Sequence, residues 1–168
     1  MTTPPAPHAP SSVVGDDDAD LIDRLIANLA MTQPSEPNGK RILIVDDEPS
    51  IVRLLKVNLE RQGYSIETAE NGVQALAKIM AAYPDLLITD VMMPEMDGLE
   101  LVEHVRRHPA LRDLPIVLLT QKSAERDVMN GYARGADVYL NKPFNPGELN
   151  LIVRRLLFPG EDAPEDVK

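Results

Sequence analysis

Carboxylates, a hydroxyl and an ammonium group stand at the ends of four short apolar runs in this chain. Asp46 and Asp47 follow the first run, Asp90 follows a second, Thr120 ends a third, and Lys142 comes after a fourth. If these runs are neighbouring parallel strands, the polar groups meet at the edge where open α/β sheets place their functional groups. The three carboxylates would then repel one another unless positive charge lay among them.

Such a cluster is suited to phosphoryl transfer. Lys142 supplies one positive charge, and a divalent cation would supply the rest. Oxygen ligands with no His or Cys nearby favour Mg²⁺ or Mn²⁺ over zinc, and magnesium prefers to bridge carboxylates to a phosphate oxygen. With the metal engaged, a remaining Asp can attack phosphorus in line, while Thr120 and Lys142 contact the other phosphate oxygens.

The elements that must position these groups alternate in type from Arg41 onward. Apolar runs of strand length take turns with helix-period segments, which predicts a parallel sheet with helices on both faces. The predicted strands span residues 41–45, 64–69, 86–89, 116–120 and 138–140. The first predicted helix begins at Pro49 and stops at Gly63, and the others span residues 73–82, 99–107, 124–134 and 146–157.

The N-terminal part of the chain differs from this central part. Residues 1–15 are rich in Pro, Thr and Ser, and residues 32–39 repeat that character, which is typical of linkers. An apolar stripe at helical spacing lies between them, made of Leu21, Ile22, Leu25, Ile26 and Leu29. It predicts a short amphipathic helix near residues 16–31. Because such a helix is marginal alone, we expect a mostly disordered extension over residues 1–39, unless the helix docks onto the domain, a twin helix or a partner.

Composition narrows the classes of function. The formal charge of −10 is concentrated towards the two ends of the chain, and it is unlike a surface that binds nucleic acid. Cysteine is absent, which excludes disulfides, thiolate metal sites and a Cys nucleophile. The sequence has no basic leader and no apolar run of the ~20 residues needed to cross a bilayer. We therefore expect a cytoplasmic protein without membrane insertion.

Four segments together resemble the receiver domain of bacterial response regulators. They read ILIVDDEP (42–49), DLLITDVMMPEMDG (85–98), PIVLLT (115–120) and GADVYLNKPF (135–144). The resemblance covers residues 40–158, between the extension and an acidic tail at 159–168. It implies the flavodoxin-like (CheY-like) fold, a five-stranded parallel sheet of strand order 2-1-3-4-5 flanked by helices on both faces.

The resemblance also implies a role for each site residue. Asp90 would be the phosphoacceptor and a ligand of Mg²⁺, Asp47 a direct ligand, Asp46 a ligand through water, and Met92 a ligand through its carbonyl. Gln121 stands where the family usually has a small residue. With Met92 and the following Lys122, its side chain is expected to control access of water or phosphodonor to the site.

A conformational switch is implied as well. Thr120 and Lys142 would contact the phosphoryl group. Thr120 would move towards the phosphate, and Tyr139 would turn inward behind Thr120. That movement would alter a face made by three elements, at residues 124–134, 138–140 and 146–157. The bond from Lys142 to Pro143 is typically cis in this family, and X-Pro pairs are where a cis bond is least unfavourable.

We therefore expect a phosphoacceptor response regulator, and not an enzyme. It would take phosphate from a sensor histidine kinase or phosphotransfer protein and signal to a protein partner, as a monomer or as a dimer formed on phosphorylation. The eleven residues after Leu157 leave no room for an output domain, so no direct contact with nucleic acid is expected.

Two alternative functions remain open at this point. A metal-dependent phosphatase with an Asp nucleophile would carry a second acid two residues later, where this chain has Met92. A pseudo-receiver scaffold that works without phosphate would lack a site residue, and none is missing from the sequence.

Overall fold

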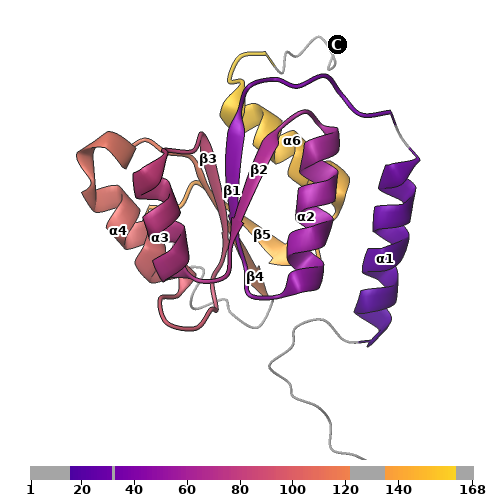
Figure 1. Ribbon diagram of the computed structural model, residues 1–168, viewed down its shortest axis with the longest axis horizontal. Helices are drawn as coiled ribbons and strands as arrows, with labels where there is room; N and C mark the ends of the chain where they lie inside the picture. The colour runs from indigo at the N-terminus through magenta and orange to yellow at the C-terminus, as the bar shows by residue number, and fades with distance from the viewer. Residues whose placement is uncertain (1–15, 32, 122–134, 162–168) are drawn as a thin grey trace, which may run out of the picture.

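A single parallel sheet lies between two layers of helices (Figure 1). The computed structural model describes residues 16–31, 33–121 and 135–161. Its strands are β1 (Arg41–Val45), β2 (Ser65–Ala69), β3 (Leu86–Asp90), β4 (Ile116–Gln121) and β5 (Val138–Lys142). Every pair is parallel, and the order is β2-β1-β3-β4-β5. The predicted fold class and strand order are confirmed.

The helices follow the sequence signals closely. They are α1 (Asp16–Ala30), α2 (Pro49–Arg61), α3 (Gly72–Ala81), α4 (Gly98–Arg107) and α6 (Pro146–Leu157), with a short 3-10 helix, η1 (Pro109–Leu111). Asn71, Asp97 and Asn145 cap the amino ends of α3, α4 and α6 with their side chains. The helix predicted at residues 124–134 lies outside the described residues. Across the part that the structure describes, no helix combines the length and apolarity needed to cross a membrane.

Two apolar clusters hold the sheet, one on each face. Side chains alternate along β1, so that Ile42 and Ile44 pack towards α2 and α6, whereas Leu43 and Val45 pack towards α3 and α4. All five residues of β3 are buried, as expected for a central parallel strand covered on both faces. This packing fixes the positions of the strand ends, which carry the polar groups.

The end of α2 is set by Gly63, as predicted. Gly63 has φ +99°, and its N–H donates to the Glu60 carbonyl while the Tyr64 N–H donates to the Leu59 carbonyl. These two bonds form the Schellman arrangement that ends many helices. A Cβ at this glycine would lie 2.3 Å from the Glu36 carbonyl oxygen, so the close approach of the preceding linker also requires glycine here.

The N-terminal extension packs against the domain. Ile22 of α1 is 6% exposed, and three more apolar side chains of α1 pack against the same cluster as α2. The linker is bonded too, since the Ser35 N–H donates to the Arg61 carbonyl and the Asn38 N–H to the Gly63 carbonyl. The amphipathic helix that the sequence predicts near residues 16–31 is thus present as α1, and its apolar stripe packs against α2, which is one of the docking places left open by the sequence.

Candidate functional site

Acidic side chains from two neighbouring strands meet at the carboxyl edge of the sheet. Asp46 and Asp47 come directly after β1, and Asp90 is the last residue of β3. One carboxylate oxygen from each lies within 4.8 Å of the others. Asp46 and Asp90 are 1% and 5% exposed, whereas Asp47 is exposed. Asp47 is therefore the solvent-exposed member of this cluster.

The turn after β1 holds Asp46 in place. Its N–H donates to the Ala69 carbonyl of β2, and its carboxylate accepts from the Glu48 N–H at 3.0 Å. Pro49 then begins α2 at once. A short turn from a buried strand into a helix thus presents both carboxylates at the sheet edge.

Lys142 brings a positive charge to this cluster from β5, on the far side of β4. Its Nζ lies 3.0 Å from Asp46 Oδ2 and 3.4 Å from Asp90 Oδ1, and its side chain is 5% exposed. The ammonium thus bridges the two buried carboxylates. Isolated carboxylates at this depth would be strongly unfavourable, and the ion pairs offset part of that cost.

The electrostatics of the three buried groups are interdependent. The pKa of Asp90 is raised to about 7, chiefly by burial and next by the charge on Asp46, while Lys142 opposes both effects. Burial also raises the pKa of Asp46, against the pull of Lys142. Burial alone would lower the pKa of Lys142, but the charges on Asp46 and Asp90 outweigh it and raise that pKa. Lys142 is therefore charged at neutral pH, and the site attracts further positive charge.

Thr120 and Tyr139 lie on the strands next to this cluster. Asp90 pairs with Leu119 in the register between β3 and β4, so Thr120 is one residue further towards the site, and it is 1% exposed. Tyr139 pairs with Leu118 across β5 and β4, and it is half-buried against the apolar cluster under α3 and α4. The structure thus brings Thr120 to the site edge and leaves Tyr139 behind it.

The loop from Val91 to Asp97 closes over the backbone of Asp90. A Cβ at Gly98 would lie 2.0 Å from the Asp90 carbonyl oxygen, and the Gly98 N–H donates to the Val91 carbonyl at 2.8 Å. Glu95 has φ +67°, which few residues other than glycine adopt. Met92 is 58% exposed at the start of this loop. Its thioether cannot donate a proton, unlike the second acid of an Asp-nucleophile phosphatase.

Two further predicted site residues, Pro143 and Gln121, stand at the ends of β5 and β4. The Lys142–Pro143 peptide bond is cis, and Pro143 is exposed. Gln121 ends β4 and pairs in register with Lys142, while its side chain is outside the described part of the structure. Lys122 also lies outside the described residues.

Two residues of the site were not assigned a role from the sequence. Glu48 is close enough for its negative charge to raise the pKa values of Asp46 and Lys142, after the larger effects already named. Gly98 allows the loop to close on Asp90. The role of Glu48 could have been inferred from its position directly after Asp46 and Asp47. The contact of Gly98 with Asp90 is visible only in three dimensions.

The donor set fits a hard divalent cation. Three carboxylates offer oxygens within 4.8 Å of one another, and no His or Cys belongs to this group. Oxygen-only ligation with one or two carboxylates and open positions for water is the arrangement that Mg²⁺ prefers. The residues present therefore fit magnesium.

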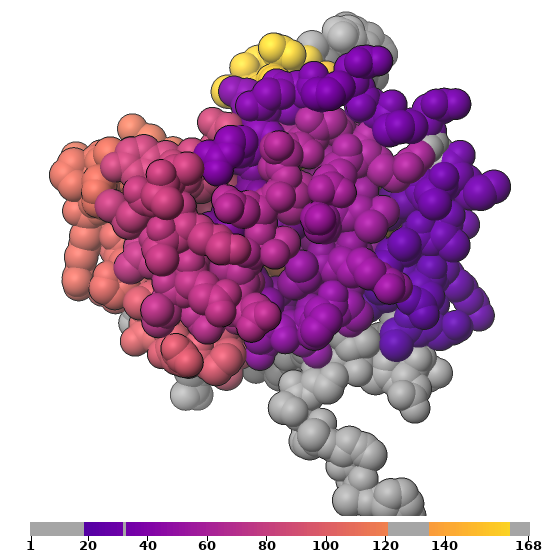
Figure 2. Space-filling view, viewed as in Figure 1, coloured from indigo at the N-terminus to yellow at the C-terminus, as the bar shows by residue number. Residues whose placement is uncertain are grey.

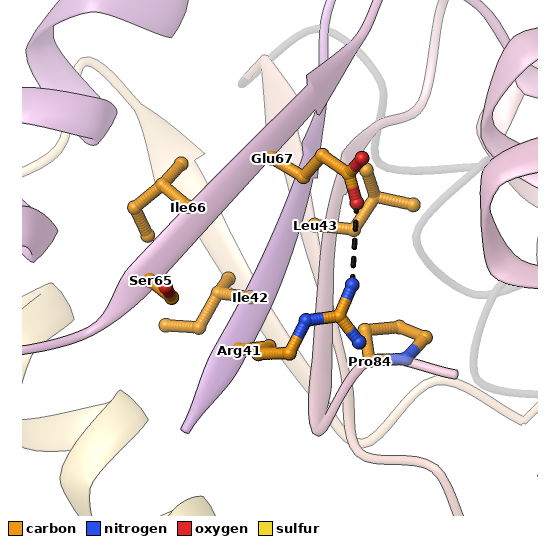
Figure 3. A pocket seen from close by; sticks show the side chains of 7 residues that line it. All are labelled: Arg41, Ile42, Leu43, Ser65, Ile66, Glu67 and Pro84. Atoms are coloured by element: carbon orange, nitrogen blue, oxygen red, sulfur yellow. Dashed lines mark hydrogen bonds and ion pairs between the residues drawn. The ribbon is translucent and has the colours of Figure 1, made fainter. Parts of the chain in front are cut away.

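A separate hollow of about 270 Å³ lies at the amino-terminal ends of β1 and β2, away from the acidic cluster (Figure 3). Arg41 and Glu67 face each other across it, with 3.4 Å between a guanidinium nitrogen and a carboxylate oxygen. Arg41 also donates to the Tyr83 carbonyl. These groups are paired with each other, and the hollow begins at Arg41, five residues before Asp46, so it is not part of that site.

Comparison with known proteins gives a consistent result. The family model described as the response regulator receiver domain matches residues 42–154. The alkaline phosphatase synthesis transcriptional regulatory protein PhoP of Bacillus subtilis is 46% identical over 125 residues, which are 74% of this chain and 51% of that protein. The chain thus spans about half the length of the curated relatives it matches.

Solved structures agree with the sequence relatives. The chemotaxis response regulator CheY4 of Vibrio cholerae superposes with a TM-score of 0.67 at 39% identity, over 71% of this chain and all of that one. The response regulator TrrA of Thermotoga maritima, crystallised in complex with Mg²⁺ and BeF, gives a TM-score of 0.63 at 46% identity. That match covers 70% of this chain and 99% of TrrA.

Proposed function

The chain belongs to the response regulator receiver family, and on that basis we propose that Asp90 accepts a phosphoryl group in a site completed by Mg²⁺. One observation carries the proposal. Asp90 is a buried carboxylate at a strand end, with Lys142 at 3.4 Å and the carboxylates of Asp46 and Asp47 beside it. A carboxylate flanked by a metal site and an ammonium group is arranged to attack phosphorus.

In the proposed step, a carboxylate oxygen of Asp90 forms a bond to phosphorus in line with the bond that breaks. The leaving group of the donor departs with the electron pair, and Asp90 becomes an acyl phosphate. Asp46 and Asp47, with Asp90 itself and the Met92 carbonyl, would hold the magnesium. When bound, Mg²⁺ neutralises charge on the phosphoryl oxygens.

Two other side chains would act on the transferred group. Lys142 would also contact a phosphoryl oxygen, since its ammonium group has three donors and contacts two carboxylates, those of Asp46 and Asp90. Thr120 would donate its hydroxyl proton to another oxygen as it moves towards the site. Tyr139, half-buried behind Thr120 in the register of β4 and β5, would turn inward as space opens.

Partners follow from the same proposal. A sensor histidine kinase or a phosphotransfer protein would be the donor, and a downstream protein would bind the face that includes β5, α6 and residues 124–134, with the receiver as a monomer or as a phosphorylation-dependent dimer. We further propose that residues 40–158 form the receiver domain in a cytoplasmic protein, and that Met92, Gln121 and Lys122 control access to the phosphate.

Intact mass spectrometry tests the proposal directly. The chain should gain one phosphoryl group when incubated with acetyl phosphate and Mg²⁺, and the gain should be stable in acid and labile in base. Asp90→Asn should abolish it, whereas Asp113→Asn, at an exposed position away from the site, should not. EDTA should also prevent the gain. A wild-type chain that gains no phosphoryl group under these conditions would refute the proposal.

A further inference from the structure

The outer side of α3 is an exposed apolar surface, which we call the α3 face (Val73, Ala77 and Met80). Val73 and Met80 are 49% and 46% exposed, and Ala77 between them is exposed as well. The three residues stand at i, i+4 and i+7, so they form one line along the helix. Among the described residues no element covers this line, and α3 lies open on the face of the molecule that Figure 2 shows.

The opposite side of α3 fixes the helix on the domain. Ala75 and Ile79 are fully buried in the apolar cluster that also contains residues of α4. At the amino end the Asn71 side chain caps the helix, and the Gly72 N–H donates to the Met96 carbonyl at 3.0 Å. The α3 face is therefore not needed to attach the helix, and it is held as a rigid apolar surface.

Charge favours a second copy of this chain as the occupant of the α3 face. The chain carries a formal charge of −10, and a charge of this size makes identical molecules repel one another. Residues 71–84, however, contain no acidic side chain. Their one charge is that of Lys78, whose ammonium group donates to the Thr68 carbonyl of β2. Two copies can therefore meet helix to helix here without opposing acidic groups on the two helices.

The α3 face is also complementary to itself in shape. Ala77, a small side chain, stands between the larger Val73 and Met80. If two α3 helices cross in antiparallel orientation about a twofold axis at Ala77, Val73 of each copy meets the partner's Met80. The two alanines at the centre allow the helix axes to approach closely. Antiparallel helices also bring the opposite ends of their dipoles together, which is favourable.

We propose that the α3 face is a dimerisation surface, on which two copies of this chain pair about a twofold axis at Ala77. A helix of ten residues offers less than the ~1,200 Å² of total surface that stable complexes bury, so this dimer is weak. It forms without a phosphoryl group, which distinguishes it from a dimer that depends on phosphorylation.

The α3 face is linked to the acidic site through the backbone. The hydrogen bond from Gly72 to Met96 joins α3 to the loop that closes over Asp90. A Cβ at Gly72 would lie 2.7 Å from the Met96 carbonyl oxygen, so helix and loop pack backbone against backbone. Pairing of α3 would thus stabilise this loop in both copies. The inference itself does not rest on the proposed function, and it can be tested without any phosphodonor.

Sedimentation velocity tests the pairing, at concentrations from about 1 µM to about 1 mM, where weak complexes form. The mean mass of wild type should rise with concentration towards twice the monomer mass. Met80→Glu puts a charge in the apolar contact and should weaken association at least about tenfold. Leu151→Glu, a similar change at a 48% exposed position on α6, should associate like wild type. A wild type that stays monomeric, or a Met80→Glu chain that associates equally well, would overturn the proposal.

Cysteine cross-linking tests the twofold axis. The chain has no cysteine, so Ala77→Cys introduces a single thiol, and at the axis two such thiols lie within reach of a disulfide. The thiols of Val73→Cys would lie about 12 Å apart, since four residues advance about 6 Å along each helix. Mild oxidation should therefore link Ala77→Cys at least about tenfold faster than Val73→Cys. Equal rates, or no link through Ala77→Cys, would show that the copies do not pair in this way.

Discussion

At the scale of single residues, the site places its charges where they oppose folding. Asp46 and Asp90 are buried within reach of one ammonium group, and the pKa of each is raised, chiefly by burial. A carboxylate that is costly to ionise when no cation is bound gains most in free energy from binding a cation, or a phosphoryl group together with its metal. We interpret the unfavourable free energy of these buried negative charges as the source of affinity for those ligands.

Replacing Asp90 by Asn should stabilise the metal-free chain at alkaline pH. The pKa of Asp90 is about 7 in the folded chain, against a model value of 3.8, so its contribution to stability is present below about pH 4 and is lost as pH rises through about 7. Asn carries no such loss. Urea unfolding in EDTA at about pH 8 should show Asp90→Asn to be at least ~1 kcal/mol more stable than wild type, since one pKa unit is worth about 1.4 kcal/mol.

The same experiment near pH 4 supplies the comparison for Asp90→Asn. There the difference between the two chains should shrink, because both side chains are then neutral. Asp113→Asn, at an exposed position, should leave the pH profile of wild type unchanged. A variant at Asp90 that loses as much stability with rising pH as wild type would contradict this account of the site.

Magnesium should stabilise the folded chain through Asp47. A ligand that binds only the folded state at about ten times its Kd adds about 1.4 kcal/mol to the free energy of unfolding. Thermal unfolding with and without Mg²⁺ should show this gain in wild type, and Asp47→Asn should remove most of it because it removes a proposed direct ligand. An equal magnesium response in both chains would rule out Asp47 as a ligand.

At the scale of elements, the layers are fixed by polar contacts as well as by apolar packing. Asn58 of α2 is fully buried, and its side-chain amide exchanges two hydrogen bonds with that of Asn150 on α6, at 2.8 and 3.1 Å. A buried amide is tolerated only when its donors and acceptors are satisfied. The pair therefore fixes how α2 and α6 lie relative to each other.

Breaking the Asn58 and Asn150 pair on one side should be worse than removing both partners. Asn58→Leu leaves the Asn150 amide without its interhelical partner and should lower the free energy of unfolding by about 1–3 kcal/mol. The double variant Asn58→Leu/Asn150→Leu should recover part of that loss, since an apolar pair of similar size is often nearly neutral. Chemical unfolding of the wild-type, single-variant and double-variant chains measures these free energies. A double variant that is less stable than the single variant would contradict the role of the pair.

The sequence could predict most elements but not all of their contacts. Pro49, Gly63 and Pro146 mark helix ends because their backbone preferences act locally. The docking of α1 depends on the shape of α2, which no local signal contains, so the apolar stripe alone left three docking places open. The linker at residues 33–39 looks like a flexible one by composition, yet it is bonded to the end of α2.

At the scale of the whole molecule, the candidate site follows from the topology of the sheet. Parallel strands bring their carboxyl ends to one edge, so Asp46, Asp47, Asp90 and Lys142 could be grouped from sequence alone. The strand order could not follow from alternation of strands and helices, and it came from the resemblance to receiver domains. The contact of Gly98 with the Asp90 carbonyl needed coordinates, because it joins segments through backbone geometry.

The central claim is that the phosphoryl group is carried by Asp90, and chemical trapping tests it most directly. After incubation with acetyl phosphate and Mg²⁺, borohydride reduces an aspartyl phosphate to homoserine, which peptide mass spectrometry can locate. We predict homoserine at position 90 and at no other aspartate, and none when Mg²⁺ is withheld. Homoserine at Asp46 or Asp47, or a phosphorylated chain that yields none at position 90, would contradict the account.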